Sequence, residues 1–261
     1  MRIGIIGYGK MGKLFAKEFS TRHEVGIYSN HAEKSEFKLF SSIEELFKWA
    51  DLIVIAKSLE ETPKVLEELA KLSEKIEGKV IFDISTFKRD VIEIYKRFPE
   101  SVKVCSVHPM FGAGAKSFKG KRFIVIPVEG RGEDTNPVIN LFKEFKAEVF
   151  VADAKTHDEM MKIVIGIPYF IGISFLSFVS EFEGVENFRG TSFEYLTTYA
   201  KAVLNDSPEF IDEVLEFSKD KIKEFLRFVE KGEFNVQELR EKFEHEIEES
   251  YKRFYIVLNK E

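Results

Sequence analysis

A histidine stands at the end of a predicted strand in SVKVCSVHPMFGAG, residues 101–114. The apolar run over 102–107 predicts a buried β-strand, and His108 follows it where the chain turns into a glycine-rich loop. In open parallel sheets, ligands bind outside the carboxyl ends of the strands. An imidazole there can take a proton from a hydroxyl as hydride leaves the same carbon, because its ordinary pKa lies near neutral pH. His108 is therefore a candidate catalytic base, and the alternative is a histidine that only packs in a turn.

A second predicted strand, over 79–85, also ends in polar side chains. The stretch DISTFK supplies Ser85, Thr86 and Lys88 at this end. If both strands belong to one parallel sheet, these groups lie at the same edge as His108. Ser85 is then a candidate hydrogen-bonding partner for a substrate hydroxyl, and Lys88 is a candidate for orienting a substrate carboxylate.

A glycine-rich motif with the spacing GxGxxG begins at residue 7, directly behind a predicted strand over 2–7. A predicted helix over 10–20 follows it, which is the context that a dinucleotide-binding loop requires. The first glycine permits a tight turn, the second lets a pyrophosphate approach the backbone, and the third lets helix and strand pack closely. Free amides at the helix N-terminus then face the phosphates. The candidate cofactor-binding residues of the loop are Gly7, Tyr8, Gly9, Lys10, Met11 and Gly12.

The end of the second predicted strand, over 24–29, bears on the choice between NAD and NADP. An acid at this place holds the ribose hydroxyl in many NAD enzymes. Here the chain reads Ser29, Asn30 and His31, with Lys34 shortly after. These groups can hold a 2′-phosphate, so they are further cofactor-binding candidates. The sequence slightly favours NADP, and a loop that tolerates both cofactors is the alternative.

Strand-like and helix-like segments alternate as far as residue 153, and nearly everything beyond it has helical spacing. The strands are near-continuous Val and Ile runs, typical of a parallel sheet covered on both faces. We therefore expect an α/β fold, with an N-terminal Rossmann-type doubly wound parallel sheet over 1–153. An all-helical substrate and dimerisation domain is expected over 154–261. Strands are expected over 2–7, 24–29, 51–57, 79–85, 102–107, 122–127 and 147–153, and the first helices over 10–20, 42–50 and 62–76.

The composition indicates a cytoplasmic protein that binds neither nucleic acid nor membrane. A net charge of −6 at pH 7, with both signs interspersed, argues against a nucleic-acid-binding surface. The single cysteine, Cys105, excludes an intramolecular disulfide framework and is expected to be a small buried residue. The apolar stretch 163–179 has about the length of a short membrane span, but Gly166 and Pro168 interrupt it. We expect this stretch to be a buried helix at a domain or subunit interface.

Several motifs together resemble the prephenate/arogenate dehydrogenase family of tyrosine biosynthesis. VHPMFG at 107–112 carries the resemblance with DISTFK and the glycine loop, and THDEMMKIVIGIPYF at 156–170 and SPEF at 207–210 add to it. The resemblance is strong over 1–170 and looser beyond. It implies NAD(P)-dependent oxidative decarboxylation of prephenate to 4-hydroxyphenylpyruvate, or of arogenate to tyrosine. It also implies that His108 is the base, that Ser85 bonds the substrate hydroxyl, and that the helical domain forms a homodimer.

Two positions of the helical part depart from the family pattern. Tyr169 stands where the family usually has a histidine, and Ala202 stands where it usually has an arginine that pairs with the substrate carboxylate. Tyr169 can still donate a hydrogen bond, and Lys201 can supply charge without the bidentate fork of arginine. Arg189 and Lys88 are further sources of positive charge. The candidate substrate-binding residues are Lys88, Tyr169 and Lys201.

The pair His157 and Asp158 has two interpretations. Thr156 with acids close behind it makes a good helix start, and this capping role is favoured over direct catalysis. The spacing of the remaining histidines makes no metal site. The alternatives to prephenate dehydrogenase are an arogenate dehydrogenase, a diverged NADP-dependent oxidoreductase, and a non-catalytic cofactor-binding homologue with a different ligand.

Overall fold

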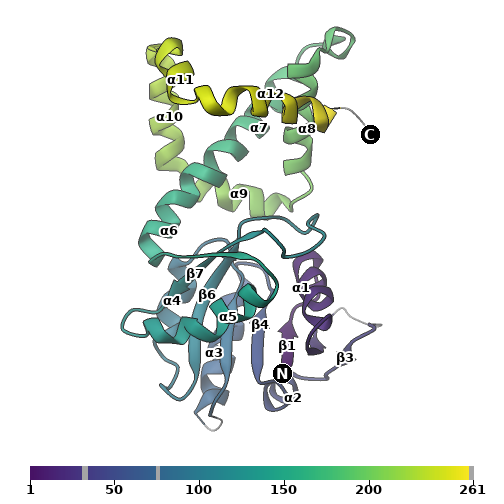
Figure 1. Cartoon of the computed structure of the whole chain (residues 1–261), viewed down its shortest axis with the longest axis vertical. Helices are drawn as coiled ribbons and strands as arrows, with labels where there is room; N and C mark the ends of the chain where they lie inside the picture. The colour runs from purple at the N-terminus through teal and green to yellow at the C-terminus, as the bar shows by residue number, and fades with distance from the viewer. Residues whose placement is uncertain (31–34, 75–76, 259–261) are drawn as a thin grey trace. The chain divides into compact units, whose positions relative to one another are not determined.

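The computed structural model describes residues 1–30, 35–74 and 77–258. The chain divides into two compact units, Met1–Asp158 and Glu159–Glu261. Unit 1 contains a sheet with helices packed on it, and unit 2 is built from helices (Figure 1). The mixed α/β class predicted from the sequence is confirmed. The units divide after Asp158, whereas the change in sequence character lies near residue 153.

The sheet of unit 1 has eight strands in the order β3-β2-β1-β4-β5-β6-β7-β8. All neighbouring strands are parallel except β6 and β7. The two-residue strand β3 is the one strand that the sequence patterns did not predict. The strands are β1 Arg2–Ile6, β2 Glu24–Tyr28, β3 Lys38–Leu39, β4 Leu52–Ile55, β5 Val80–Asp83, β6 Lys103–Pro109, β7 Arg122–Pro127 and β8 Glu148–Val151.

The antiparallel pairing of β6 and β7 differs from the expected all-parallel sheet. The pairing sets His108 opposite Ile124. Residues 110–121, which connect the two strands, form no helix. Parallel neighbours need a crossover that is usually helical, whereas a short loop returns the chain in the opposite direction. The absence of a helix between these strands therefore reverses β7, and β8 follows β7 in parallel after α5.

Helices cover both faces of the sheet, as a doubly wound fold requires. One buried cluster contains Phe15 of α1 and Phe142 of α5, and the other contains Leu46 of α2, Leu66 of α3 and Val91 of α4. Successive strand residues alternate between the two clusters, because side chains of a strand point to opposite faces. The short helix α4 was not expected from the sequence. The helices are α1 Lys10–Ser20, α2 Ile43–Trp49, α3 Glu61–Ser73, α4 Arg89–Tyr95 and α5 Asn136–Glu144.

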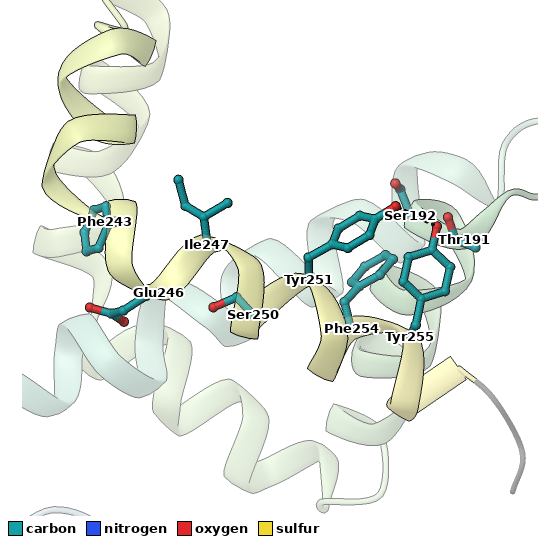
Figure 2. A pocket seen from close by; sticks show the side chains of 9 residues that line it. All are labelled: Thr191, Ser192, Phe243, Glu246, Ile247, Ser250, Tyr251, Phe254 and Tyr255. Carbon is teal, nitrogen blue, oxygen red and sulfur yellow. Dashed lines mark hydrogen bonds between the residues drawn. The ribbon is translucent and has the colours of Figure 1, made fainter.

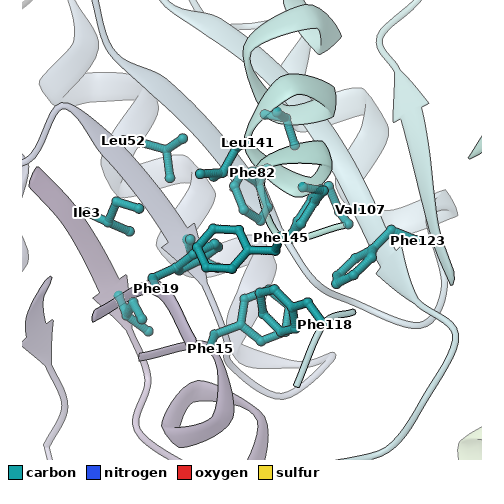
Figure 3. Close-up of a cluster of buried hydrophobic side chains, with 14 of the residues drawn as sticks. Ile3, Phe15, Phe19, Leu52, Phe82, Val107, Phe118, Phe123, Leu141 and Phe145 are labelled. Carbon is teal, nitrogen blue, oxygen red and sulfur yellow. The ribbon is translucent and has the colours of Figure 1, made fainter. Parts of the chain in front are cut away.

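The cluster on the α1 and α5 face is rich in phenylalanine (Figure 3). Phe123 of β7 stacks on Phe142 with ring centroids 4.0 Å apart. Phe118, from the loop before β7, lies 4.8 Å from Phe15 in an edge-to-face arrangement. All four rings are fully buried. This aromatic contact surface fixes the reversed strand β7 against the helices and so fixes the strand end that carries His108.

The single tryptophan packs on the second strand. A Cβ atom at Gly26 of β2 would meet the Trp49 ring at 2.7 Å, so this position has room only for glycine. Trp49 also lies 5.1 Å from Phe40 between ring centroids. The side chain of Lys38 lies over the same indole. The indole is therefore an integral part of the β2 side of unit 1.

Unit 2 begins within one long helical segment. The helix α6, Ala154–Met161, starts in unit 1 and continues through a π-helical turn, Lys162–Gly166, into α7, Ile167–Val179. A Cβ atom at Gly166 would lie 2.0 Å from the Ser218 hydroxyl, so the π-turn allows a close approach of the chain between α9 and α10. The other helices are α8 Thr191–Val203, α9 Pro208–Phe217, α10 Lys219–Lys231, α11 Val236–Lys242 and α12 Glu244–Leu258.

The segment Ala154–Val179 is long and apolar enough to cross a membrane, with a mean hydropathy of 1.9. Only 11% of its most apolar window is buried within the chain. Along α7 itself, Gly172 is the one fully buried residue, where it meets Tyr199 of α8. Most of α7 is half-buried, whereas Ile163, Val164 and Phe178 are exposed, so the chain leaves part of this apolar surface uncovered. Its burial at a domain or subunit interface stays a prediction.

Candidate active site

His108, the next-to-last residue of β6, is hydrogen-bonded to His157 of α6, which is in turn bonded to Asp158. Its Nδ1 lies 2.9 Å from Nε2 of His157, and Nδ1 of His157 lies 2.8 Å from the carboxylate of Asp158. His108 and His157 are 5% and 1% exposed. The carboxylate of Asp158 also accepts the backbone N–H groups of Lys88 and Arg89, at the start of α4. The loop after β5, the end of β6 and the start of α6 thus meet at one point.

The role of the His157–Asp158 pair differs from the one favoured from sequence. Asp153, and not Thr156, caps α6, because its side chain accepts the Thr156 N–H at 2.9 Å. Asp158 caps a different helix, α4, and His157 faces His108. Sequence reasoning identified the pair but missed its contact with His108. No local pattern in the sequence signals that contact, because the two histidines lie 49 positions apart in the chain.

Lys88 is placed differently from the expectation for a carboxylate-binding residue. Its side chain is fully buried, and its ammonium donates to the carbonyl oxygens of Ser85 and Val107 at 2.5 and 2.9 Å. It also lies 3.7 Å from the carboxylate of Asp83. With these contacts the ammonium has no surface left for a substrate. The sequence expectation for Lys88 is therefore corrected: this lysine ties the ends of β5 and β6 together.

The electrostatic setting keeps both histidines neutral. Burial lowers the pKa of His108 well below its ordinary value, and the nearby Lys88 ammonium and His157 lower it further. Burial also lowers the pKa of His157, although Asp158 acts in the opposite direction. A neutral imidazole retains one lone pair, so His108 is in the protonation state that a general base needs at neutral pH.

Ser85 lies beside His108 at the same sheet edge. The β5–β6 ladder pairs Asp83 with Ser106, and two residues further along each chain stand Ser85 and His108. The Ser85 hydroxyl is buried and has no hydrogen-bond partner within the described part of the chain. An unpaired buried hydroxyl is costly, on the order of 1–3 kcal/mol, unless a ligand or water satisfies it. The hydroxyl is thus available to a bound molecule.

The glycine loop between β1 and α1 has the geometry of a phosphate cradle. Gly7 has φ of +103°, and a Cβ there would lie 2.2 Å from the Ala56 carbonyl oxygen. A Cβ at Gly12 would lie 2.1 Å from the Gly7 carbonyl oxygen. Gly9, in contrast, is the N-cap of α1 and has no neighbouring atom within 4 Å of a Cβ. Gly7 and Gly12 are required by packing, and Gly9 leaves open space above the helix N-terminus, which fits a pyrophosphate.

The remaining loop residues frame this open space. Tyr8 and Met11 are half-buried against the α1 face of the core, whereas Lys10 is exposed. At the end of β2, the Tyr28 hydroxyl donates to the Asn30 side-chain oxygen at 2.9 Å, and Ser29 is half-buried. The candidates His31 and Lys34 lie outside the described residues.

The substrate-binding candidates of unit 2 are described within that unit. The Tyr169 hydroxyl donates to the Asp206 carboxylate at 2.5 Å. Burial and this carboxylate raise the pKa of Tyr169, which keeps the hydroxyl protonated. Lys201 of α8 is exposed and lines a cavity of about 640 Å³ together with Arg189. The structure therefore brings Lys201 and Arg189 to one cavity and engages Tyr169 elsewhere with Asp206.

A second cavity of unit 2, of about 650 Å³, is lined mainly by residues of α12, three of which are aromatic. Figure 2 shows Tyr251, Phe254 and Tyr255 grouped beside Thr191 and Ser192 at the start of α8. Neither cavity includes residues of the His108 cluster or of the glycine loop. Both cavities are lined by residues of unit 2 alone.

Comparison with known proteins identifies the nucleotide-binding part of the chain. Residues 28–151 match the family model described as prephenate dehydrogenase, nucleotide-binding domain. This part of the chain is therefore similar to the nucleotide-binding domain of the prephenate dehydrogenase family. The matched segment includes the end of β2, Ser85 and His108. It begins after the glycine loop, whose assignment therefore rests on its geometry. The resemblance to the prephenate/arogenate dehydrogenase family is confirmed.

Solved structures share the fold over nearly the whole chain. Prephenate dehydrogenase from Aquifex aeolicus, in complex with hydroxyphenyl propionate and NAD⁺, is 18% identical with a TM-score of 0.75, covering 98% of each chain. Arogenate dehydrogenase from Synechocystis is 15% identical with a TM-score of 0.70, covering 97% of this chain and all of that one. Pyrroline carboxylate reductase from Plasmodium falciparum is 17% identical with a TM-score of 0.54. It covers 99% of this chain and 93% of its own.

The matched family model describes the nucleotide-binding domain of a dehydrogenase, and the solved structures show that the fold is shared. The enzyme class predicted from the sequence is thereby confirmed. No curated protein sequence gives a significant match. The identities of 15–18% leave the choice between prephenate and arogenate to the chain's own residues.

Proposed function

We propose that the protein is a prephenate dehydrogenase that uses NAD(P) for the oxidative decarboxylation of prephenate to 4-hydroxyphenylpyruvate. The observation that carries this proposal is that neutral His108 and the unsatisfied Ser85 hydroxyl stand at the ends of the neighbouring strands β6 and β5, which Lys88 joins through the Ser85 and Val107 carbonyl oxygens. A substrate alcohol needs both a hydrogen-bond partner and a base when its carbon is oxidised. Similarity to the family supplies the substrate class, and the carboxyl ends of the strands are where ligands of such sheets bind.

In this proposal, Ser85 bonds the 4-hydroxyl of the substrate ring and holds it toward His108. His108 accepts the hydroxyl proton as hydride leaves the same carbon, the ring carboxylate leaves as carbon dioxide, and the resulting phenolate takes the proton back to give the hydroxyl of the product. The nicotinamide, when bound, supplies the hydride acceptor. Aromatisation of the ring makes the overall step favourable. Because His108 is already neutral, no proton has to be removed from it before turnover.

The cofactor proposal rests on the loop and on the end of β2. Gly9 leaves room for the pyrophosphate at the N-terminus of α1, and the free amides of this turn are its donors. The residues after β2 include Ser29 and Asn30 and no carboxylate at positions 28–30. We therefore propose that NADP is slightly favoured over NAD.

The assembly proposal rests on the uncovered surface of α7. Ile163, Val164 and Phe178 are exposed and most of α7 is only half-buried within the chain, although water is a poor environment for such a surface. A second copy of unit 2 would cover it, so we propose a cytoplasmic homodimer formed through the helical domain. Light scattering that gives a monomer, or partition of the protein into membranes, would contradict this proposal.

Arogenate dehydrogenase and a diverged oxidoreductase are the competing proposals. Ala202 and Tyr169 favour divergence, because the first cannot pair with a carboxylate and the second is bonded to Asp206. Lys201 and Arg189, which share one cavity, are the remaining cationic candidates for a substrate carboxylate. Replacing each of them by Gln and measuring KM separates these candidates.

The experiment that tests this proposal measures the reduction of NADP, and of NAD, in the presence of prephenate and, separately, of arogenate. We expect turnover that His108→Ala abolishes and Ser85→Ala reduces. His245→Ala, at an exposed position of α12, is the matched control and should keep full activity. Tight cofactor binding without turnover of either substrate would refute the proposed reaction and leave a cofactor-binding homologue.

A further inference from the structure

The chain of contacts from Asp158 through His157 to His108 has a direction, because a carboxylate only accepts hydrogen bonds. Two backbone N–H groups, those of Lys88 and Arg89, already point at this carboxylate with distances of 3.0–3.2 Å. The third neighbour of the carboxylate is Nδ1 of His157 at 2.8 Å. Nδ1 of His157 must therefore carry a proton.

The protonation of His157 then determines that of His108. Burial holds His157 neutral, and a neutral imidazole has one N–H and one lone pair. Since Nδ1 carries the proton, Nε2 carries the lone pair. Nε2 lies 2.9 Å from Nδ1 of His108, so His108 must donate from Nδ1. The lone pair of neutral His108 is then on Nε2.

We propose that Asp158 and His157 are positioning residues that hold His108 in the tautomer whose Nε2 is the proton acceptor. This inference rests on the proposed function at one point: the proton that Nε2 accepts comes from the substrate hydroxyl. The reverse tautomer would direct an N–H at the substrate hydroxyl and leave no base. A pair assigned by sequence to helix capping thus determines which atom of His108 reacts.

Other charged and titratable groups near the histidines change the pKa values of the imidazoles, but they do not determine which ring nitrogen carries the proton. The Lys88 ammonium lowers the pKa of His108, and it is itself held by Asp83 and the two carbonyl oxygens at the strand ends. Buried Cys105 has a raised pKa and remains a neutral thiol. None of these groups hydrogen-bonds an imidazole nitrogen of either histidine in the described contacts. Only Asp158 and His157 specify the tautomer.

The same contacts stabilise the product of proton transfer. When Nε2 takes the substrate proton, His108 becomes an imidazolium whose Nδ1–H still donates to His157. Nδ1 of His157 faces the Asp158 carboxylate. The negative carboxylate and the positive His108 ring therefore lie on opposite sides of the His157 ring. This arrangement offsets part of the opposing effect of Lys88.

The direct test is the tautomer of His108 in the substrate-free protein, read from the ¹⁵N chemical shifts of its ring nitrogens at neutral pH. His108→Asn and His157→Asn assign the signals. We expect Nδ1 of His108 to be protonated and Nε2 to be unprotonated. A proton on Nε2 of His108 would overturn the proposal, whatever the protein turns over.

Asp158→Asn is the matching perturbation. The amide oxygen is expected to accept the two backbone N–H groups, and its NH₂ group would donate to His157 and reverse both imidazoles. We expect the ¹⁵N pattern of His108 to reverse and kcat to fall on the order of 10²–10⁴-fold, with KM for the cofactor unchanged. Asp153→Asn is the control, because it changes the capping carboxylate of α6, whose described contact is with Thr156 and with neither imidazole, and leaves the backbone carbonyl that accepts the His157 N–H. This variant should change neither quantity.

A second pair of variants keeps the proposal testable if Asp158→Asn fails to fold. His157→Gln retains an amide oxygen for the Nδ1–H of His108, and His157→Leu removes the acceptor. We expect the glutamine variant to retain clearly more activity than the leucine variant, and equal activities would contradict a positioning role. If wild type turns over neither prephenate nor arogenate, the proposed function fails, and the ¹⁵N measurement still decides the tautomer.

Discussion

Substitution of the two glycines Gly7 and Gly9 by alanine separates folding from cofactor binding within one loop. At Gly7, the φ of +103° costs an alanine about 1–3 kcal/mol, and the contact of 2.2 Å with the Ala56 carbonyl adds about 1–3 kcal/mol. We therefore expect Gly7→Ala to lower the free energy of unfolding by about 2–6 kcal/mol, a large part of the about 5–15 kcal/mol typical of a domain. Urea denaturation measures this loss directly.

At Gly9 the same substitution meets no neighbour within 4 Å, and φ of −74° suits any residue. We expect the stability of Gly9→Ala to stay within about 0.5 kcal/mol of wild type. The new methyl group occupies the space proposed for the pyrophosphate. Loss of one charge-assisted hydrogen bond to a backbone amide, about 1.5–3 kcal/mol, corresponds to a Kd about 10- to 150-fold weaker.

Cofactor titration followed by NADPH fluorescence gives this Kd, with urea denaturation of the same samples as the control for folding. Gly9→Ala that binds NADPH as tightly as wild type would refute the assignment of this loop to the pyrophosphate. A Gly7→Ala protein with wild-type stability would refute the steric argument. The two outcomes are independent of each other and of the substrate.

Three further predictions concern the stability of unit 1. Tyr95→Phe removes the hydroxyl that bridges the backbone N–H and the carboxylate of buried Asp83. The free energy of unfolding measured in urea should therefore fall by about 1–3 kcal/mol. An unchanged urea midpoint would contradict this prediction. Ser42→Ala removes the N-cap of α2, and we expect a loss of about 1 kcal/mol in the same assay, with Ser101→Ala at an exposed turn as the control. Because the folded protein holds the pKa of His108 below its ordinary value, the unfolded chain binds more protons below about pH 6.5, and stability should fall as the pH is lowered through that value. Urea midpoints at several pH values check this, and His108→Asn should reduce the fall.

The parts of the fold set by local spacing could be predicted from the sequence. The glycine loop, the strand ends at Ser85 and His108, and the Ser42 cap of α2 each depend on residues within a few positions of one another. Periodicity and turn chemistry act over that range, so a single sequence contains the information. The site's position at the sheet edge followed from the parallel strands.

Features that depend on distant contacts could not be predicted. His157 meets His108 across 49 positions of the chain, and no local pattern specifies that pairing. Lys88 was misjudged because lysine is almost never fully buried unless it is paired, and its partners are carbonyl groups of two separate strands. The reversal of β7 depends on the lack of a helix in residues 110–121, where the sequence analysis assigned no element.

The packing of Trp49 against Gly26 gives the protein a native optical probe. Trp49 is the only tryptophan of the chain, and it lies in unit 1 beside the strand whose end is proposed to hold the ribose. Its emission therefore reports the loss of structure in unit 1 alone, whereas far-UV circular dichroism includes the helices of unit 2. If the two signals change at different urea concentrations, the units unfold independently, and if they coincide, the chain unfolds as one cooperative body. No label needs to be introduced to decide between these cases.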